Sequence, residues 1–159
     1  MSASLERVKR ALAEAGIDVE VIEMAASTRT AAEAAEAAGC VIDQIAKSIV
    51  FRGETSGEAV LFIVAGGNRV DAAMAAHLAG EPLGKADAEL IRSQTGFAIG
   101  GVAPVGHLNP IRAWFDPRLA EFGTVWAAAG TPRHIFAIAP TDLLRISSAQ
   151  IADFARQAL

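Results

Sequence analysis

One lysine, Lys47, stands inside an apolar segment that runs from Ala46 to Phe51. An ammonium group in such a segment needs water, an anion or a carboxylate beside it, because burying the charge alone is costly. Two interpretations of this lysine are open. Either its long stem lies along apolar surface with the ammonium at the water boundary, or the ammonium holds an anion or a carbonyl group of a ligand.

Between Gly96 and His107 the sequence has four glycines and Pro104, so this segment cannot be regular helix. The adjacent residues Gly100 and Gly101 would let the backbone approach a ligand closely, with N–H groups directed into one cavity. Such donors stabilise a developing oxyanion or hold a carboxyl or phosphate oxygen. A tight connection in a crowded sheet is the structural alternative. The segment lacks the glycine patterns of nucleotide-binding loops, which disfavours that class of ligand.

The other reactive side chains form no familiar catalytic pattern. His77 has no acidic or histidine partner four residues further on, and Cys40 is the sole cysteine. Without an H-E-x-x-H segment or a cysteine pair, we expect no metal site and no cofactor. The absence of a G-x-S-x-G segment disfavours a conventional serine hydrolase. A hydrolytic reaction would therefore need water, positioning and backbone donors.

The composition is that of one folded domain. Of the 159 residues, 52% are hydrophobic and 20% are charged, which excludes disordered, collagen-like and disulfide-rich classes. The longest apolar run, residues 59–65, is far shorter than the roughly 18 residues of a membrane span. The first ten residues lack the apolar stretch of a secretory signal, so we expect a cytoplasmic protein. The net charge of −4 excludes a strongly basic surface, and any nucleic-acid contact must be local.

Hydrophobic periodicity and turn residues predict where the helices and strands lie. Helices are predicted at residues 4–15, 31–38, 70–78, 87–93, 141–144 and 148–158. Strands are predicted at residues 17–22, 46–51, 59–65, 111–115, 124–128 and 134–139. The second and third strands should form a hairpin, and Thr30 with Glu33 has the form of a capping box. Because helices neither alternate strictly with strands nor group apart, this order predicts a single α+β domain over residues 1–159 with a mixed sheet.

Three segments occur in one order along the chain. They are Ser27-Thr28 before an Ala-rich helix, D-Q-I-A-K-S-I-V-F from Asp43 to Phe51, and T-G-F-A-I-G-G-V-A-P-V-G-H from Thr95 to His107. Together they resemble the YbaK/prolyl-tRNA synthetase insertion-domain family of aminoacyl-tRNA deacylases, over nearly the whole chain. The resemblance implies a compact α+β domain whose mixed, strongly curved β-sheet is flanked by helices. It also implies an enzyme of translation fidelity that hydrolyses the ester between a wrong amino acid and tRNA.

The resemblance assigns roles to the lysine and to the glycine loop. In that family the lysine matching Lys47 is required and engages the 3′-terminal region of the aminoacyl-tRNA. The N–H groups of Gly100 and Gly101 would stabilise the carbonyl oxyanion, in the G-x-x-x-P loop that ends at Pro104. The chemistry is substrate-assisted, with a hydroxyl or thiol of the substrate or its terminal ribose in place of an enzyme nucleophile. This agrees with the missing nucleophile.

The amino acid that is removed stays open. Ser27 and Thr28 could orient a substrate through their hydroxyls, although such residues before a helix more often bond nearby backbone. His107 and His134 are candidates for a polar wall of the amino-acid pocket. The cysteinyl-specific branch has a Gln where this chain has His107, so alanine, serine, threonine or another small residue is as good a candidate as cysteine.

The expected partner is mischarged tRNA, contacted at its acceptor end, with an aminoacyl-tRNA synthetase as a second candidate partner. No DNA and no membrane are expected. Arg29 and Arg52 flank the predicted site in the sequence and could contact phosphate, with solvated surface charge as the alternative. Two other functions remain open. The chain could be a non-catalytic module that binds aminoacyl-tRNA or a synthetase, or an esterase that acts on small molecules in the same cleft.

Overall fold

The computed structural model describes residues 2–25 and 28–158. The α-helices are α1 (Ala3–Glu14), α2 (Ala31–Ala38), α3 (Ala72–Ala79), α4 (Ala88–Thr95) and α5 (Pro140–Ser147), with short 3-10 helices at Ile42–Gln44 and Pro117–Glu121. The strands are β1 (Val21–Glu23), β2 (Ile45–Gly53), β3 (Ala59–Ala65), β4 (Asn68–Val70), β5 (Leu83–Lys85), β6 (Arg112–Phe115), β7 (Val125–Ala128), β8 (His134–Ile138), β9 (Gln150–Ile151) and β10 (Ala155–Gln157). None of the helices in the described part of the chain is long and apolar enough to cross a membrane.

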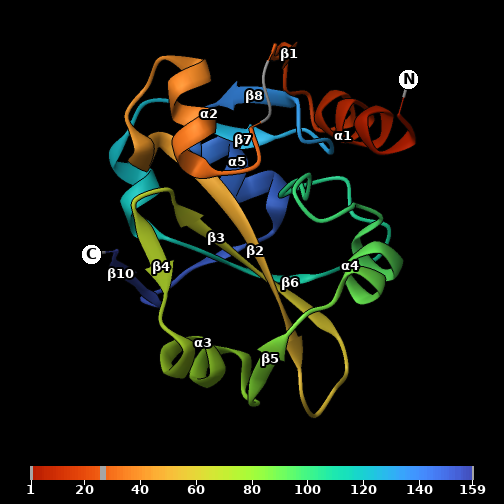
Figure 1. Ribbon diagram of the computed structural model, residues 1–159, viewed down its shortest axis with the longest axis vertical. Coiled ribbons are helices and arrows are strands. Elements are labelled where there is room, and N and C mark those ends of the chain that lie inside the picture. Colours follow the sequence, from red (N-terminus) through yellow and green to blue (C-terminus); the bar gives the residue numbers. More distant parts are fainter. Residues whose placement is uncertain (1, 26–27, 159) are drawn as a thin grey trace.

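One sheet organises the molecule, with β2 as the long strand through its middle (Figure 1). The strand order is β1-β8-β7-β2-β3-β6-β9, and β5 also pairs with β2. The pairs β2/β7, β3/β6 and β6/β9 are parallel, whereas the others are antiparallel. A second, two-stranded ribbon joins β4 to β10. The predicted α+β class with a mixed sheet and flanking helices is therefore confirmed, while the strong curvature and the extent of the domain stay predictions.

The sheet is covered on both faces, which explains the continuous apolar run of β3. Every residue of β3 is buried, and side chains on its two faces enter two separate cores. On one face Leu61 and Ile63 pack with residues of α1, including Val8. On the other face Phe62 stacks on Trp114 with ring centroids 5.0 Å apart. A strand buried on both faces has no polar alternation, so it reads as an uninterrupted hydrophobic segment.

The short helix α2 begins and ends where the sequence predicts. Thr30 accepts a hydrogen bond from the Glu33 N–H at 3.1 Å, and the Glu33 carboxylate accepts one from the Thr30 N–H at 3.1 Å, so the predicted capping box is present. Gly39 ends the helix in the left-handed conformation with φ of 71°. Six of the eight residues of this helix are alanines, whose side chains bury little area. The two caps therefore contribute much of what holds the helix in place.

The prediction of a last helix over residues 148–158 is wrong. Ser148 has φ of 58° and ends α5, and the chain then forms two short strands, β9 and β10. Strand β9 adds to the edge of β6, β10 pairs with β4, and Phe154 between them is fully buried. The spacing of apolar residues suits a helix, but the free edges of β6 and β4 offer main-chain partners that the local pattern cannot reveal. Strands β4 and β5, which were not predicted, are likewise three-residue segments that exist through their partners.

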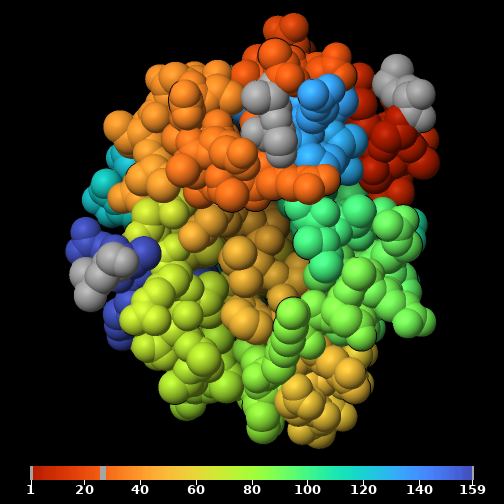
Figure 2. Space-filling view, viewed as in Figure 1, coloured from red at the N-terminus to blue at the C-terminus, as the bar shows by residue number. Residues whose placement is uncertain are grey.

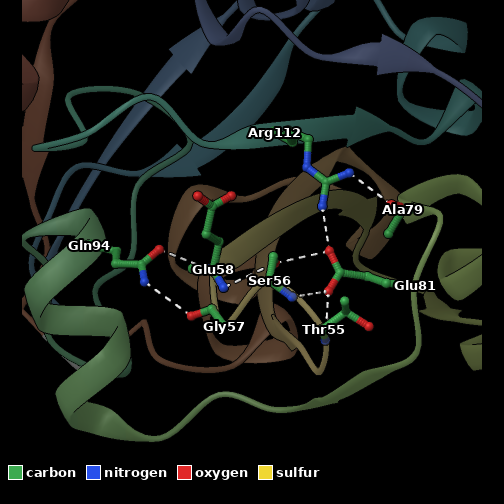
Figure 3. Close-up of polar contacts among 9 residues, drawn as sticks. Thr55, Ser56, Gly57, Glu58, Ala79, Glu81, Gln94 and Arg112 are labelled. Carbon is green, nitrogen blue, oxygen red and sulfur yellow. Dashed lines mark hydrogen bonds and ion pairs between the residues drawn. The ribbon is translucent and has the colours of Figure 1, made fainter.

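The far end of the β2–β3 hairpin is fastened by Glu81, which follows α3 (Figure 3). The Glu81 carboxylate accepts hydrogen bonds from the N–H groups of Thr55 and Ser56 at 3.0 and 2.9 Å, and from Arg112 at 2.9 Å. Its side chain is 9% exposed. Gln94 of α4 accepts a further hydrogen bond from the Ala59 N–H at 2.7 Å. The turn of the hairpin is thereby tied to the segments that carry α3, α4 and β6.

Glu81→Gln is expected to lower the Tm, because an amide accepts weaker hydrogen bonds than a carboxylate and turns an NH₂ group toward existing donors. Hydrogen bonds, chiefly from the Ser56 N–H, lower the pKa of Glu81. The stability it confers is therefore present above the ordinary carboxyl pKa and is lost as the pH falls through the lowered pKa. Thermal unfolding from pH 3 to 7 measures this, with Glu58→Gln, an exposed carboxylate in the same hairpin, as the control. Equal Tm differences for the two variants at every pH would contradict the assignment.

Candidate functional site

A cavity of about 750 Å³ opens beside β2. Its walls are α2, the strands β2, β7 and β8, and the glycine loop at residues 99–102. Figure 2 shows the hollow near the middle of this face, with the orange-gold atoms of β2 at its floor. The residues of α2 that line the cavity are Ala31, Ala32 and Ala34. Their small side chains leave room for a ligand.

The floor of this cavity lies at a gap in the sheet. On the edge of β2 that faces away from β3, strand β7 pairs only with Ile45 and Ala46. On the same edge β5 pairs only with residues 51–53. Within the part of the chain that the structure describes, residues 47–50 therefore have no strand beside them on this edge, and the first three of them line the cavity. The site is built where the sheet stops being continuous.

Lys47 lines the cavity from within this gap. Its ammonium Nζ donates a hydrogen bond to the Asn68 carbonyl oxygen of β4 at 2.6 Å. Burial lowers the pKa of Lys47, and the negative charges of Asp116 and Asp43 act in the opposite direction. An ammonium has three N–H donors, so two remain for a ligand after the bond to Asn68.

Two carboxylates hold the surroundings of Lys47 in place. Asp116 is 3% exposed and accepts hydrogen bonds from the Ala65 N–H at 3.0 Å and from the Asn68 side-chain amide at 2.9 Å. Asp43 accepts from the Gly67 N–H at 2.8 Å and pairs with Arg118 at 3.0 Å. These bonds fix the turn between β3 and β4, which carries the carbonyl that Lys47 contacts. The roles of Asp116 and Asn68 were not predicted from the sequence. Asp116-Pro117 has the form of an ordinary turn, and Asn68 lies 21 residues from Lys47.

The glycine loop forms another wall of the cavity. Gly100 lines the cavity with φ of 90°, a conformation that favours glycine, and the Arg29 side chain lies against it. No acceptor for the Gly100 N–H exists among residues 2–25 and 28–158. The Gly101 N–H differs, since it donates to the Ala98 carbonyl at 3.1 Å. Gly101 is buried against the Thr131 backbone, so the first glycine faces the cavity and the second allows the loop to pack.

The structure separates the remaining predicted site residues. Thr28 and Arg29 line the cavity, and the Thr28 hydroxyl donates to the Pro132 carbonyl at 2.8 Å. His134 lies in an adjoining cavity of about 350 Å³, which Arg29 also lines, and its Nδ1 is 2.6 Å from the Thr131 hydroxyl. Ser27 lies outside the described residues.

Two residues of the glycine segment and one distant arginine are not among those that line either cavity: Pro104, His107 and Arg52. His107 bonds the Ala103 carbonyl at 2.8 Å and packs edge-on against Phe97, and burial lowers its pKa. Its imidazole therefore holds the end of the loop. Trp126 and Ile135, which sequence analysis did not single out, form apolar walls. Both lie in predicted strands, but only the pairing of β7 with β8 brings them to the site.

No group of three His, Cys, Asp or Glu side chains among the described residues is arranged to hold a metal ion. The polar side chains that line the larger cavity come from Thr28, Arg29, Thr30, Lys47 and Ser48. Among the described residues, this lining contains two cations and no acidic side chain or histidine. The cavity therefore suits a ligand with an anionic part and an apolar part. The carboxylate of Glu33 lies 3.1 Å from the Thr30 hydroxyl, but both groups belong to the capping box of α2.

Several known proteins are similar to this chain in sequence and in fold. Residues 25–146 match the family described as the aminoacyl-tRNA editing domain. The uncharacterized protein YwhH of Bacillus subtilis (strain 168) is 31% identical over 149 residues, which are 93% of this chain and 94% of that protein. A crystal structure of a proposed trans-editing enzyme for prolyl tRNA synthetase is 49% identical, covers 98% of this chain and 99% of that one, and superposes with a TM-score of 0.90. The hypothetical protein APE2540 is 26% identical, over 94% and 99% of the two chains, with a TM-score of 0.86.

The lowered pKa of Lys47 predicts how its contribution to stability varies with pH. The unfolded chain binds this proton more tightly than the folded one, so the folded protein gains stability as the pH rises through the lowered pKa. Relative to Lys47→Met, the wild type should therefore become more stable as the pH rises toward 10.5, the ordinary pKa of a lysine. Urea unfolding at each pH measures the difference, with Lys85→Met as the baseline for loss of an exposed ammonium. A fall in relative stability over this range would mean that Asp116 and Asp43 outweigh burial.

Gly101→Ala should destabilise the protein by about 1–3 kcal/mol, the usual cost of overpacking a filled site. The added Cβ would lie 2.9 Å from the Thr131 Cα, which is backbone and cannot rotate away. Chemical denaturation measures the loss. Gly123→Ala is the matched control, because nothing lies within 4 Å of its added Cβ. Equal stability of the two variants would show that the loop is not packed as described.

Proposed function

Because the chain belongs to the aminoacyl-tRNA editing domain family, we propose that it hydrolyses the ester of mischarged aminoacyl-tRNA as a freestanding, trans-acting deacylase. The observation that carries the proposal is the meeting of Lys47 and Gly100, which are 53 positions apart in the sequence, in one cavity. One contributes a cation and the other an N–H without an acceptor in the described chain. A cation can bind the phosphodiester of the tRNA 3′ end, and an N–H donor can stabilise the oxyanion that forms from the acyl ester.

The lining of the cavity supports a substrate of this shape. A volume of about 750 Å³ lies within the range of sites for small molecules and can take a terminal nucleoside with its amino acid. Lys47 and Arg29 are suited to the phosphate and ribose oxygens of the 3′ end. The apolar walls, which include Ile99, Trp126 and Ile135, are suited to the base and to a small apolar side chain. The amino acid itself remains open within this class.

Hydrolysis here needs no covalent enzyme intermediate. A nucleophilic hydroxyl requires a base within hydrogen-bond reach. The Thr28 hydroxyl donates to Pro132, and the Ser48 hydroxyl has no partner in the described chain. The Thr30 hydroxyl does contact the Glu33 carboxylate, but that carboxylate also accepts from the Thr30 N–H as part of the cap of α2. In the proposed reaction a water oxygen bonds to the ester carbonyl carbon, and the bond from that carbon to the ribose oxygen breaks. The ribose oxygen takes up the proton that water releases, relayed by the neighbouring ribose hydroxyl. The Gly100 N–H stabilises the carbonyl oxygen while it carries negative charge.

The acidic net charge agrees with recognition of only the acceptor end. A protein of net charge −4 cannot neutralise many phosphates, so a few contacts at Lys47 and Arg29 would make affinity weakly dependent on salt. A synthetase could supply the remaining affinity by presenting the tRNA. The second candidate function, a non-catalytic module that binds aminoacyl-tRNA or a synthetase, shares the cavity and the cations but makes no turnover.

A panel of mischarged tRNAs tests the proposal. Release of the amino acid from at least one member, with a rate above that of uncatalysed hydrolysis, would support a deacylase. Tight binding without turnover would support the binding module instead. Hydrolysis of free aminoacyl esters with none of aminoacyl-tRNA would indicate a small-molecule esterase.

Lys47→Met should reduce kcat/KM for the hydrolysed aminoacyl-tRNA by at least about 100-fold, since the variant keeps the stem and removes the charge that positions the 3′ end. Single-turnover deacylation measures the loss, and circular dichroism verifies the fold. Lys85→Met, which removes an exposed ammonium outside the cavity, should keep the wild-type rate. Retention of activity in Lys47→Met would refute the anchoring role.

A further inference from the structure

The main chain of Ser48 points into the gap in the sheet. The Asp116 N–H donates to the Ile63 carbonyl at 2.8 Å, and the Ala65 N–H donates to the Asp116 carboxylate, so these residues of β3 direct their main-chain groups away from β2. Ser48 lies opposite Ile63 in the register of β2 and β3. Opposed residues of an antiparallel pair either exchange both hydrogen bonds or exchange none. The N–H and the carbonyl of Ser48 therefore face the other edge of β2.

The same alternation is visible further along β2. The Gly53 N–H points to the β3 side, where it donates to the Glu58 carbonyl at 2.9 Å. The Glu54 N–H points to the other side, where it donates to the Pro82 carbonyl at 2.9 Å. Ser48 is six residues before Glu54 and has the same parity, so its main-chain groups project to the β5 and β7 side.

No strand receives these groups at Ser48. The pairing of β2 with β7 ends at Ala46, and the pairing with β5 begins at Phe51. In the described chain no ladder partner lies opposite Ser48 on this edge, and its N–H makes no hydrogen bond outside the strand ladders. The Ser48 hydroxyl is also buried and has no hydrogen-bond partner in the described chain. Unsatisfied polar groups in a buried place are rare because each costs free energy, and a ligand that pairs with them would remove this cost.

We propose that Ser48 receives the amino acid of the substrate as an additional residue of the sheet, by exchanging two hydrogen bonds with it. The α-ammonium of the aminoacyl group donates to the Ser48 carbonyl, and the ester carbonyl accepts from the Ser48 N–H. In an extended amino acid these two groups point the same way, as they do in a hydrogen-bonded pair of strands. This assignment rests on the proposed function, and it specifies the substrate class as an ester with a free α-amino group.

The position of Ser48 makes these contacts compatible with the rest of the site. It lies between Lys47 and Ile49, and all three line the cavity. Lys47 is thus next in sequence to the residue that would hold the amino acid. A carbonyl oxygen has two lone pairs, so the ester can accept from Ser48 and from Gly100 together.

The first experiment varies the substrate. The member of the mischarged tRNA panel that the protein hydrolyses fastest is N-acetylated, which removes the charge of the α-nitrogen and blocks its approach. We expect kcat/KM to fall at least 100-fold, beyond any change in the uncatalysed rate of hydrolysis. Equal hydrolysis of the free and acetylated forms would overturn the assignment to Ser48 and leave the deacylase function intact. Failure to hydrolyse any member of the panel would overturn the proposed function, and the assignment with it.

The second experiment varies the protein. Ser48→Pro removes the N–H that faces the gap, and proline is tolerated where a strand N–H has no ladder partner. Ser48→Ala removes the hydroxyl and keeps the N–H. We expect Ser48→Pro to lose at least 100-fold in kcat and Ser48→Ala to lose less than tenfold, with unchanged circular dichroism. Equal losses in the two variants would assign the effect to the hydroxyl and overturn the main-chain contact. If Ser48→Pro does not fold, the acetylation experiment decides alone.

Discussion

The interruption of hydrogen bonding along one edge of β2 is the constraint on which the rest of the structure depends. A strand in the middle of a sheet normally has partners on both sides, because unpaired main-chain groups away from water are costly. Here β7 leaves β2 after Ala46, and β5 reaches it only at Phe51. The cavity occupies the space that a continuing strand would fill, and α2 and the glycine loop close it from either side. A ligand site of this origin has polar main-chain donors and acceptors within its floor and apolar side chains around them.

The remainder of the fold keeps this interruption from closing. The β2–β3 ladder runs over seven residue pairs, so β2 stays paired with β3 along the whole gap. Glu81 fastens the far end of the hairpin, while Asp116 and Asp43 fasten the turn beside Lys47. Both ends of β2 are thus tied by carboxylates that accept backbone N–H groups, which are among the stronger hydrogen bonds in proteins. One ammonium and a few free amides bind a ligand only weakly unless they are held at defined positions, and a rigid strand holds them there.

Few polar side chains line the cavity. Among the described residues its lining contains no acidic residue, histidine or cysteine, which is why the proposed hydrolysis draws its protons from water and from the substrate. The charged side chains of the described lining are those of Lys47 and Arg29. Because salt screens distant surface charges, the net negative charge of the protein has little effect on a ligand held at these two cations. Placing the cations inside the cavity, and not over the surface, favours recognition of a single acyl end over non-specific contact with nucleic acid.

The sequence by itself determined the elements whose signals are local. The capping box of α2, the apolar run of β3 and the α+β class follow from residues close together in the chain, and Lys47 with the glycine loop carried the resemblance to the family whose model the chain matches. What only the tertiary structure decided depends on partners remote in sequence. The edges of β6 and β4 turn residues 150–157 into strands, and the Ala98 carbonyl engages the Gly101 N–H. Likewise the early end of β7 exposes the main chain of Ser48. A hydrogen bond between strands is a property of two segments, and the pattern of either one alone does not contain it.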